Sequence, residues 1–150
     1  MKECSCFYLY LIASQTHNSA LRTQHSQLAK ADSLCSVQPD SALALLSQLE
    51  SEMLKADKAT KMYYQLLCIK ASDKAYITHT SDSLIQEVLK YYIRKNDRHH
   101  LPEAYYYAGR VCRDLGDAPQ ALDYFQKAID ILPTEDEYEL KSRIYSQMGT

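Results

Sequence analysis

Apolar residues recur with the period of an α-helix over most of this chain, from about Ser26 onward. Near the start of this region, the successive spacings of Leu28, Ala31, Leu34 and Cys35 are three, three and one positions, which places them on one face of a helix. The same pattern, interrupted at turn-forming residues, predicts seven helices at about residues 26–37, 40–54, 57–77, 82–95, 102–115, 118–132 and 135–150. No stretch alternates as a strand does, so the pattern predicts an all-α fold of antiparallel helix hairpins.

The predicted helix ends coincide with capping residues. Asp40, Asp57 and Ser81 stand where an N-cap side chain accepts a backbone hydrogen bond. Gly116 follows the fifth helix, where a left-handed residue favours the helix end. Residues 133–137 combine a helix-ending proline with a capping box for the seventh helix.

Related helices recur at intervals of about 40 residues. The small residues that mark the repeat are separated by 39, 41 and 40 positions, at Ala29, Cys68, Gly109 and Gly149. A ring stands four positions before each of them, at His25, Tyr64, Tyr105 and Tyr145. Such a period indicates stacked helix pairs. We expect one array over residues 25–150, with pairs at about 26–52, 57–95 and 102–132 and a final unpaired helix at 135–150.

Gly109 lies in the middle of the fifth predicted helix, where glycine costs about 1 kcal/mol relative to alanine. A residue without a side chain lets two helices approach closely, and the packing around it offsets this cost. We expect Gly109 to cross the next helix at Ala121, and Ala128 to admit the helix after that. The side chains expected around the crossing are Tyr105, Val111, Leu122, Phe125 and Ile129.

Composition narrows the possible classes of protein. The 150 residues are 46% hydrophobic and 24% charged, and only 3 glycines and 4 prolines argue against a turn-rich barrel or sandwich. The net charge of −2 creates no field that favours nucleic acid, so no nucleic-acid partner is expected. The basic stretch Lys90–His100 is interpreted as cations that complement a helix C-terminus, with a nucleic-acid patch as the alternative.

No metal, cofactor or catalytic site is expected. The five cysteines are an odd count, which does not fit a disulfide framework, and Cys4 and Cys6 form a C-x-C that is not a zinc pattern. Adjacent His99 and His100 cannot share one helix face, and no third ligand accompanies them. The chain has no nucleophile elbow, P-loop or zinc-protease motif, so it is not expected to be an enzyme.

Residues 1–24 are expected to form a poorly ordered leader. An apolar run of eight residues, Cys6–Ala13, follows Lys2 and is too short to span a bilayer. The run is compatible with a working export signal, with a decayed leader and with a misplaced start codon.

The segment from Pro102 to Pro133 resembles the tetratricopeptide repeat family, whose repeat is about 34 residues long. The residues that match the family's preferred positions are Tyr105, Ala108, Gly109, Cys112, Gly116, Ala121, Phe125, Ala128 and Pro133, with Ala108 and Cys112 departing mildly from the preference. Gly149 takes the glycine position of a next repeat if that repeat starts at Ser142. The resemblance implies a right-handed solenoid over about residues 25–150, and it is strongest over 102–135.

The same resemblance implies a function. Members of the family bind peptides or helices of partner proteins in a concave groove lined by the first helix of each repeat. The matching groove positions here are Glu103, Tyr106, Arg110 and Arg113. Tyrosine and arginine are favoured at interfaces, and ordinary solvated side chains are the alternative interpretation. The resemblance therefore predicts a non-catalytic scaffold that binds a protein or peptide and needs no cofactor. C-terminal carboxylate capture is not expected, because variants that do so prefer Lys and Asn at these positions.

A finer resemblance is to the N-terminal part of bacterial tetratricopeptide sensor-regulators. Three segments carry it, at residues 31–50, 74–92 and 103–129. The alternative function is therefore a truncated sensing arm of a membrane-associated signalling or transcription regulator. Export or membrane anchoring is implied by this resemblance alone. Ile144, Tyr145 and Met148 keep the last helix apolar, which predicts self-association through an exposed end.

Overall fold

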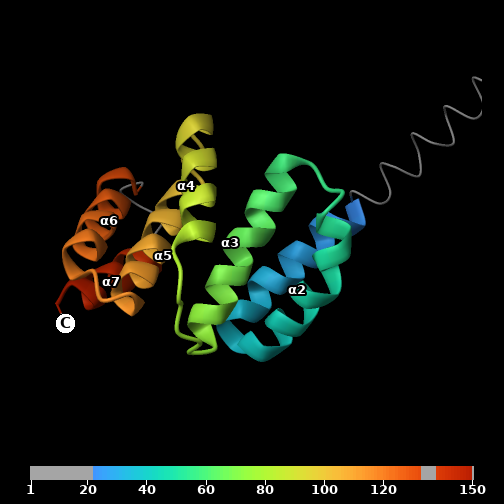
Figure 1. Ribbon diagram of the computed structural model, residues 1–150, viewed down its shortest axis with the longest axis horizontal. Helices are drawn as coiled ribbons and strands as arrows, with labels where there is room; N and C mark the ends of the chain where they lie inside the picture. The colour runs from blue at the N-terminus through green and yellow to red at the C-terminus, as the bar shows by residue number, and fades with distance from the viewer. Residues whose placement is uncertain (1–21, 133–137, 150) are drawn as a thin grey trace, which may run out of the picture.

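The computed structural model describes residues 22–132 and 138–149, and these residues form seven helices and no strand (Figure 1). Residues 22–37 are the first helix. The others, in chain order, are α2 (Pro39–Met53), α3 (Lys58–Lys74), α4 (Ser83–Lys95), α5 (Leu101–Asp114), α6 (Ala118–Ile131) and α7 (Tyr138–Met148). The predicted all-α repeat fold is confirmed.

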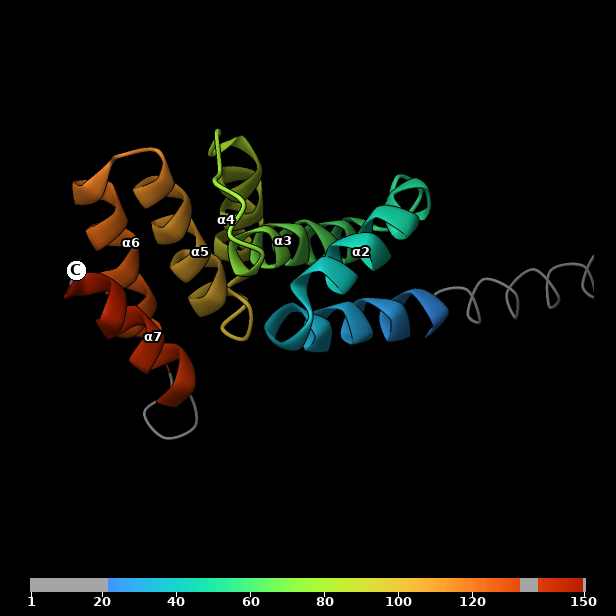
Figure 2. The same ribbon diagram turned by 90° about the horizontal axis from the view of Figure 1, so that it is seen from below.

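The helices are stacked in chain order. From α2 to α7 each helix packs on the next, and α3 also packs on α5. The first helix and α2 lie at one end of the molecule and α5 to α7 at the other, with α3 and α4 between them (Figures 1 and 2). Short connections between packed neighbours make each pair an antiparallel hairpin.

The helix starts confirm one of the three predicted N-caps. The Asp57 carboxylate accepts hydrogen bonds from the backbone N–H groups of Ala59 (2.9 Å) and Thr60 (3.1 Å). The prediction for Asp40 is wrong, because Pro39 already occupies the first turn of α2 and the cap position falls to Gln38.

The start of α4 is displaced by one residue from its prediction. Asp82 holds the cap position there, although the Ser81 hydroxyl still accepts a hydrogen bond from the Ser83 N–H at 3.2 Å.

Three helices end in the same way, with a residue in the left-handed conformation. Gly116 has φ +81° after α5, as predicted, and its side-chain-free backbone adopts this conformation without strain. Asn96 (φ 49°) follows α4, and Tyr76 (φ 57°) follows α3. After α3, the Ile77 N–H donates to the Ser72 carbonyl at 2.9 Å, which closes the helix. This turn ends α3 at Lys74, three residues before its predicted end.

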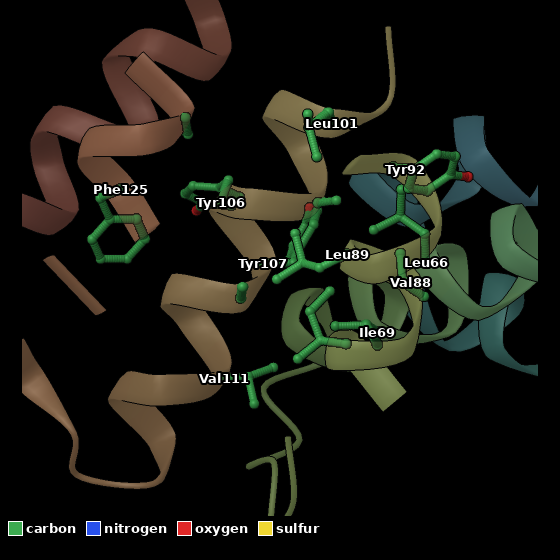
Figure 3. Packing of buried hydrophobic residues seen from close by; sticks show 14 of the residues in the cluster. Leu66, Ile69, Val88, Leu89, Tyr92, Leu101, Tyr106, Tyr107, Val111 and Phe125 are labelled. Carbon is green, nitrogen blue, oxygen red and sulfur yellow. The ribbon is translucent and has the colours of Figure 1, made fainter. Parts of the chain in front are cut away.

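The core consists of two hydrophobic clusters that share α3. One cluster contains residues of all five helices from α3 through α7. Figure 3 shows part of it around Leu66, Tyr107 and Phe125. The other joins the first helix, α2 and α3. The adjacent residues Leu66 and Leu67 are both fully buried, yet each belongs to a different cluster. As a result, α3 carries buried residues on two sides.

Gly109 is a close-approach position, as predicted, but its neighbour differs from the prediction. A Cβ placed on Gly109 would lie 2.4 Å from Cε1 of Phe125, so the aromatic ring occupies the space in front of the glycine. Ala121, the predicted partner, is buried in the same cluster without being the nearest neighbour. Leu122 does not fill the crossing, because it is 46% exposed. The prediction placed it on the wrong side of α6.

Several predictions concern residues outside the described ranges. These are the apolar run Cys6–Ala13, Pro133, and the capping box at 134–137. Residues 22–24, assigned above to the leader, belong to the first helix. Gly149 is exposed, and the atom nearest to an added Cβ would be the Tyr145 carbonyl oxygen at an ordinary 3.6 Å.

Candidate functional site

Side-chain contacts link four helices, namely the first helix, α3, α5 and α7. We call the surface that these contacts form the odd-helix face. The first link is the ammonium group of Lys70 on α3. It lies 2.7 Å from Oδ1 of Asp32 on the first helix and 2.7 Å from Oε1 of Glu103 on α5. Tyr63 adds a hydrogen bond from its hydroxyl to the other oxygen of Asp32, at 3.0 Å. One lysine thus joins three helices.

The Lys70 side chain is only 11% exposed, so its charge needs these partners. Burial acts to lower the pKa of Lys70, but the two carboxylates outweigh it and raise the pKa above its usual value. The ammonium group therefore stays charged, and it keeps Asp32 and Glu103 directed toward the space between the helices.

A second link joins α3, α5 and α7 about two turns further along α5. The Nε atom of Arg110 donates to Oδ1 of Asp73 at 2.7 Å, and its Nη1 donates to the side-chain oxygen of Gln147. Arg113 donates to the same amide oxygen at 2.7 Å and to the Gln147 carbonyl at 3.1 Å. Burial acts to lower the pKa of Arg110, but Asp73 outweighs it, so the guanidinium stays charged.

Between these two links, Arg143 of α7 lies over the ring of Tyr106, with its guanidinium carbon 5.5 Å from the ring centroid. Next to Arg143 the face is hollowed into a cleft of about 190 Å³. The cleft is lined by Asp32, Tyr63, His99, His100, Glu103, Leu140 and Arg143.

The α4–α5 loop supplies one wall of this cleft. The His100 ring stacks on Tyr92 with a centroid separation of 5.1 Å and an interplanar angle of 15°, and it lies 5.2 Å from the ring of Tyr63. Its Nδ1 is 2.8 Å from Oδ2 of Asp97, which fixes the ring orientation. His99 stays exposed at the rim.

The four predicted groove residues all lie on the odd-helix face, but they are engaged within the chain. Glu103 is bonded to Lys70, while Arg110 and Arg113 are bonded to Gln147. Tyr106 is only 4% exposed and belongs to the core. Whether these residues bind a partner stays a prediction.

Sequence reasoning missed the partners of these residues, which are Lys70, Asp73, Arg143 and Gln147. It also missed Asp32, which pairs with Lys70. A signal for them exists in the repeat period. Asp32 and Lys70 are 38 positions apart, and Arg110 follows Asp73 and precedes Gln147 by 37. These separations are close to the 39 to 41 positions between the small residues, so polar residues on the same face also recur.

Within residues 22–132 and 138–149, no group of three or more His, Cys, Asp or Glu side chains is placed to hold a metal ion. The thiols of Cys35, Cys68 and Cys112 are free. Burial raises the pKa of both Cys35 and Cys68 to about 11. These two side chains are therefore neutral at ordinary pH and act as small apolar groups.

The fold defines the class: an all-α helical repeat protein. The tetratricopeptide repeat family matches residues 102–135, which include nearly all of α5 and the whole of α6. The chain therefore contains a tetratricopeptide repeat at these residues. Such repeats in general mediate protein–protein interaction and are typically non-catalytic. No curated protein and no solved structure matched the chain. None of the helices in the described ranges is both long and apolar enough to cross a bilayer.

Proposed function

We propose that this chain is a non-catalytic scaffold that binds a peptide or a helix of a partner protein along its odd-helix face. The observation that carries the proposal is the tetratricopeptide repeat at residues 102–135, because repeats of this family generally mediate protein–protein interaction.

The geometry of the odd-helix face supports this role. The links through Lys70 and Arg110 hold four helices side by side, so the surface is preorganised before a partner arrives. The cleft beside Arg143 adds a concave feature with both charged and aromatic walls. A rigid surface of mixed polarity suits a peptide segment, whose backbone and side chains need hydrogen-bond partners as well as apolar contact.

The test is a capture experiment with the Arg110→Glu, Arg113→Glu double variant. Partners retained by the wild-type chain from its native extract would be identified, and their retention by the variant measured. The matched control is Lys90→Glu with Arg94→Glu, which makes the same charge change at exposed positions of α4. We expect the first variant to lose the partner and the control to retain it.

Reversal of Arg110 also breaks its ion pair with Asp73, so thermal melts must show that the variant is folded. A second variant, Arg113→Gln, removes charge without placing a carboxylate beside Asp73. Retention of every partner by both folded variants would overturn the assignment of the interaction to this face.

The alternative is a sensing arm of a bacterial membrane-associated signalling or transcription regulator. It rests on the resemblance of residues 31–50, 74–92 and 103–129 to such proteins. The gene sequence on either side of this frame tests it: further repeats, a membrane span and an effector domain would support the sensing arm, and their absence would contradict it.

We also propose self-association through the α7 end. Tyr145 is 53% exposed, and a shallow apolar hollow between α6 and α7 is lined in part by Leu122, Phe125 and Met148. Sedimentation over a range of concentrations tests this, and a sharply monomeric profile would contradict it.

A further inference from the structure

The cleft on the odd-helix face has the size of a single side chain. Its volume is about 190 Å³, whereas pockets for drug-sized ligands occupy about 300–1,000 Å³. If a partner segment lies along this face, as proposed above, the cleft receives one of its side chains. The charges around the cleft indicate which side chain that is.

Arg143 is the charged group of the cleft with the weakest compensation. Its Nε and Nη1 atoms are buried and have no hydrogen-bond partner. Its ion-pair partner is Glu139, whose oxygen lies 4.0 Å away on a side chain that is 85% exposed. A buried guanidinium N–H without an acceptor is costly, so the charge of Arg143 is poorly compensated within the chain. The side chain is 25% exposed, and an anionic ligand that reaches this exposed part would compensate the charge.

The surroundings of Arg143 add positive charge. Lys74 is close enough that the charge of Arg143, second to burial, lowers the pKa of Lys74. A negative group brought to Arg143 would relieve this repulsion as well.

The two carboxylates that line the cleft pair with Lys70 and not with Arg143. Asp32 and Glu103 are each 2.7 Å from the Lys70 ammonium group, and Asp32 also accepts the Tyr63 hydroxyl. They therefore remain directed at Lys70. Their remaining negative charge disfavours a doubly charged phosphate more than a singly charged carboxylate.

The apolar and aromatic walls favour a side chain with an aliphatic stem. Leu140 and the rings of Tyr63 and His100 line the cleft beside the guanidinium. Methylene groups can lie against these walls while a terminal carboxylate reaches Arg143.

We propose that the cleft binds the side-chain carboxylate of a glutamate or aspartate within the partner segment, through an ion pair with Arg143. This inference rests on the proposed function, and it specifies an acidic internal residue of the peptide as the chemistry that is recognised.

The experiment is a selection from a random peptide library whose members carry acetylated N-termini and amidated C-termini, on the immobilised full chain. The inference expects enrichment of Glu and Asp at one position. It also expects selected peptides to bind the Arg143→Gln variant about tenfold more weakly or worse. Arg94→Gln, the same change at an exposed position of α4, is the matched control and leaves binding unchanged.

The outcomes separate this inference from the proposed function. Selection of peptides without acidic enrichment, or unchanged binding to a folded Arg143→Gln variant, overturns the inference while peptide binding stands. Tighter binding after phosphoserine replaces the acidic residue, or binding that appears only with a free C-terminal carboxylate, also overturns it. Failure to select any peptide overturns both.

Discussion

At the scale of single residues, Gly109 faces the Phe125 ring at the α5–α6 crossing. An added Cβ would lie 2.4, 2.6 and 2.8 Å from three atoms of the Phe125 ring. That ring is fully buried. The glycine is therefore required by packing against an aromatic side chain rather than by backbone conformation.

We predict that Gly109→Ala destabilises the protein by about 1 kcal/mol or more, although alanine is the better helix former. Urea unfolding would measure the change. In a Phe125→Ala background the ring is absent, so the same glycine substitution should become stabilising by up to about 1 kcal/mol. Stabilisation of the otherwise wild-type chain by Gly109→Ala would contradict the packing account.

Tyr76 shows the opposite situation, a side chain where glycine fits better. Its φ of 57° is left-handed, and its side chain is 94% exposed, so packing does not compensate the strain. We predict that Tyr76→Gly raises the free energy of unfolding by up to about 1 kcal/mol. Tyr76→Ala keeps the Cβ and serves as the control, with little change expected. Equal effects of the two variants would show that removal of the tyrosine ring, and not relief of the backbone conformation, causes the change in the free energy of unfolding.

At the scale of elements, the start of α3 depends on Asp57. Its carboxylate accepts the Thr60 hydroxyl at 2.6 Å as well as two backbone N–H groups. The hydrogen bond from the Thr60 side chain is the main cause that lowers the pKa of Asp57. A lowered folded pKa means that this stabilisation is present above the unfolded pKa and is lost as the pH falls through the folded value.

We predict that Asp57→Ala costs about 1 kcal/mol at neutral pH. The difference between the two proteins should shrink below about pH 4, the range in which an unperturbed aspartate takes up a proton. Denaturant unfolding of both proteins across pH 2.5–7 checks this. A constant difference over the whole range would exclude the charged cap as its source.

The elements also show what the sequence makes predictable. Asp57 and Gly116 act through residues within a few positions of themselves, so local patterns identify them. The prediction for Asp40 is wrong because the neighbouring Pro39 determines the start of α2, which is also a local effect. Leu122 failed because the register of α6 against α5 is set by the Phe125 ring on Gly109, a contact between helices.

The candidate site was less predictable for a related reason. The family resemblance predicts Arg110 and Arg113 as groove residues, but their acceptor Gln147 is more than 30 positions away. No local pattern states that a buried lysine will bridge Asp32 and Glu103. Such pairings depend on how the helix pairs stack, which the repeat period predicts only in outline.

At the scale of the whole molecule, buried and partly buried tyrosines couple stability to alkaline pH. Burial is the main cause that raises the pKa of five of them, namely Tyr63, Tyr64, Tyr92, Tyr106 and Tyr107. Because the folded pKa lies above the unfolded value, their contribution is complete below about pH 10 and is lost as the pH rises further. The raised pKa of Lys70 acts in the same direction.

We predict that the helical structure is lost cooperatively above about pH 10. Circular dichroism at 222 nm and tyrosinate absorbance at 295 nm, recorded on the same samples, would follow folding and ionisation together. The buried tyrosines should ionise in the same step in which the helices unfold. Full ionisation of the tyrosines with an unchanged helical signal would refute this coupling.

The shared position of α3 determines how the molecule opens. Leu66 and Leu67 belong to different clusters, so the loss of either cluster's contacts exposes one apolar side of α3. Unfolding of either half therefore exposes buried residues of α3 to water. Amide hydrogens in the middle of α3 should then exchange with solvent only through global unfolding, whereas those of the first helix and α7 exchange through smaller openings at the two ends.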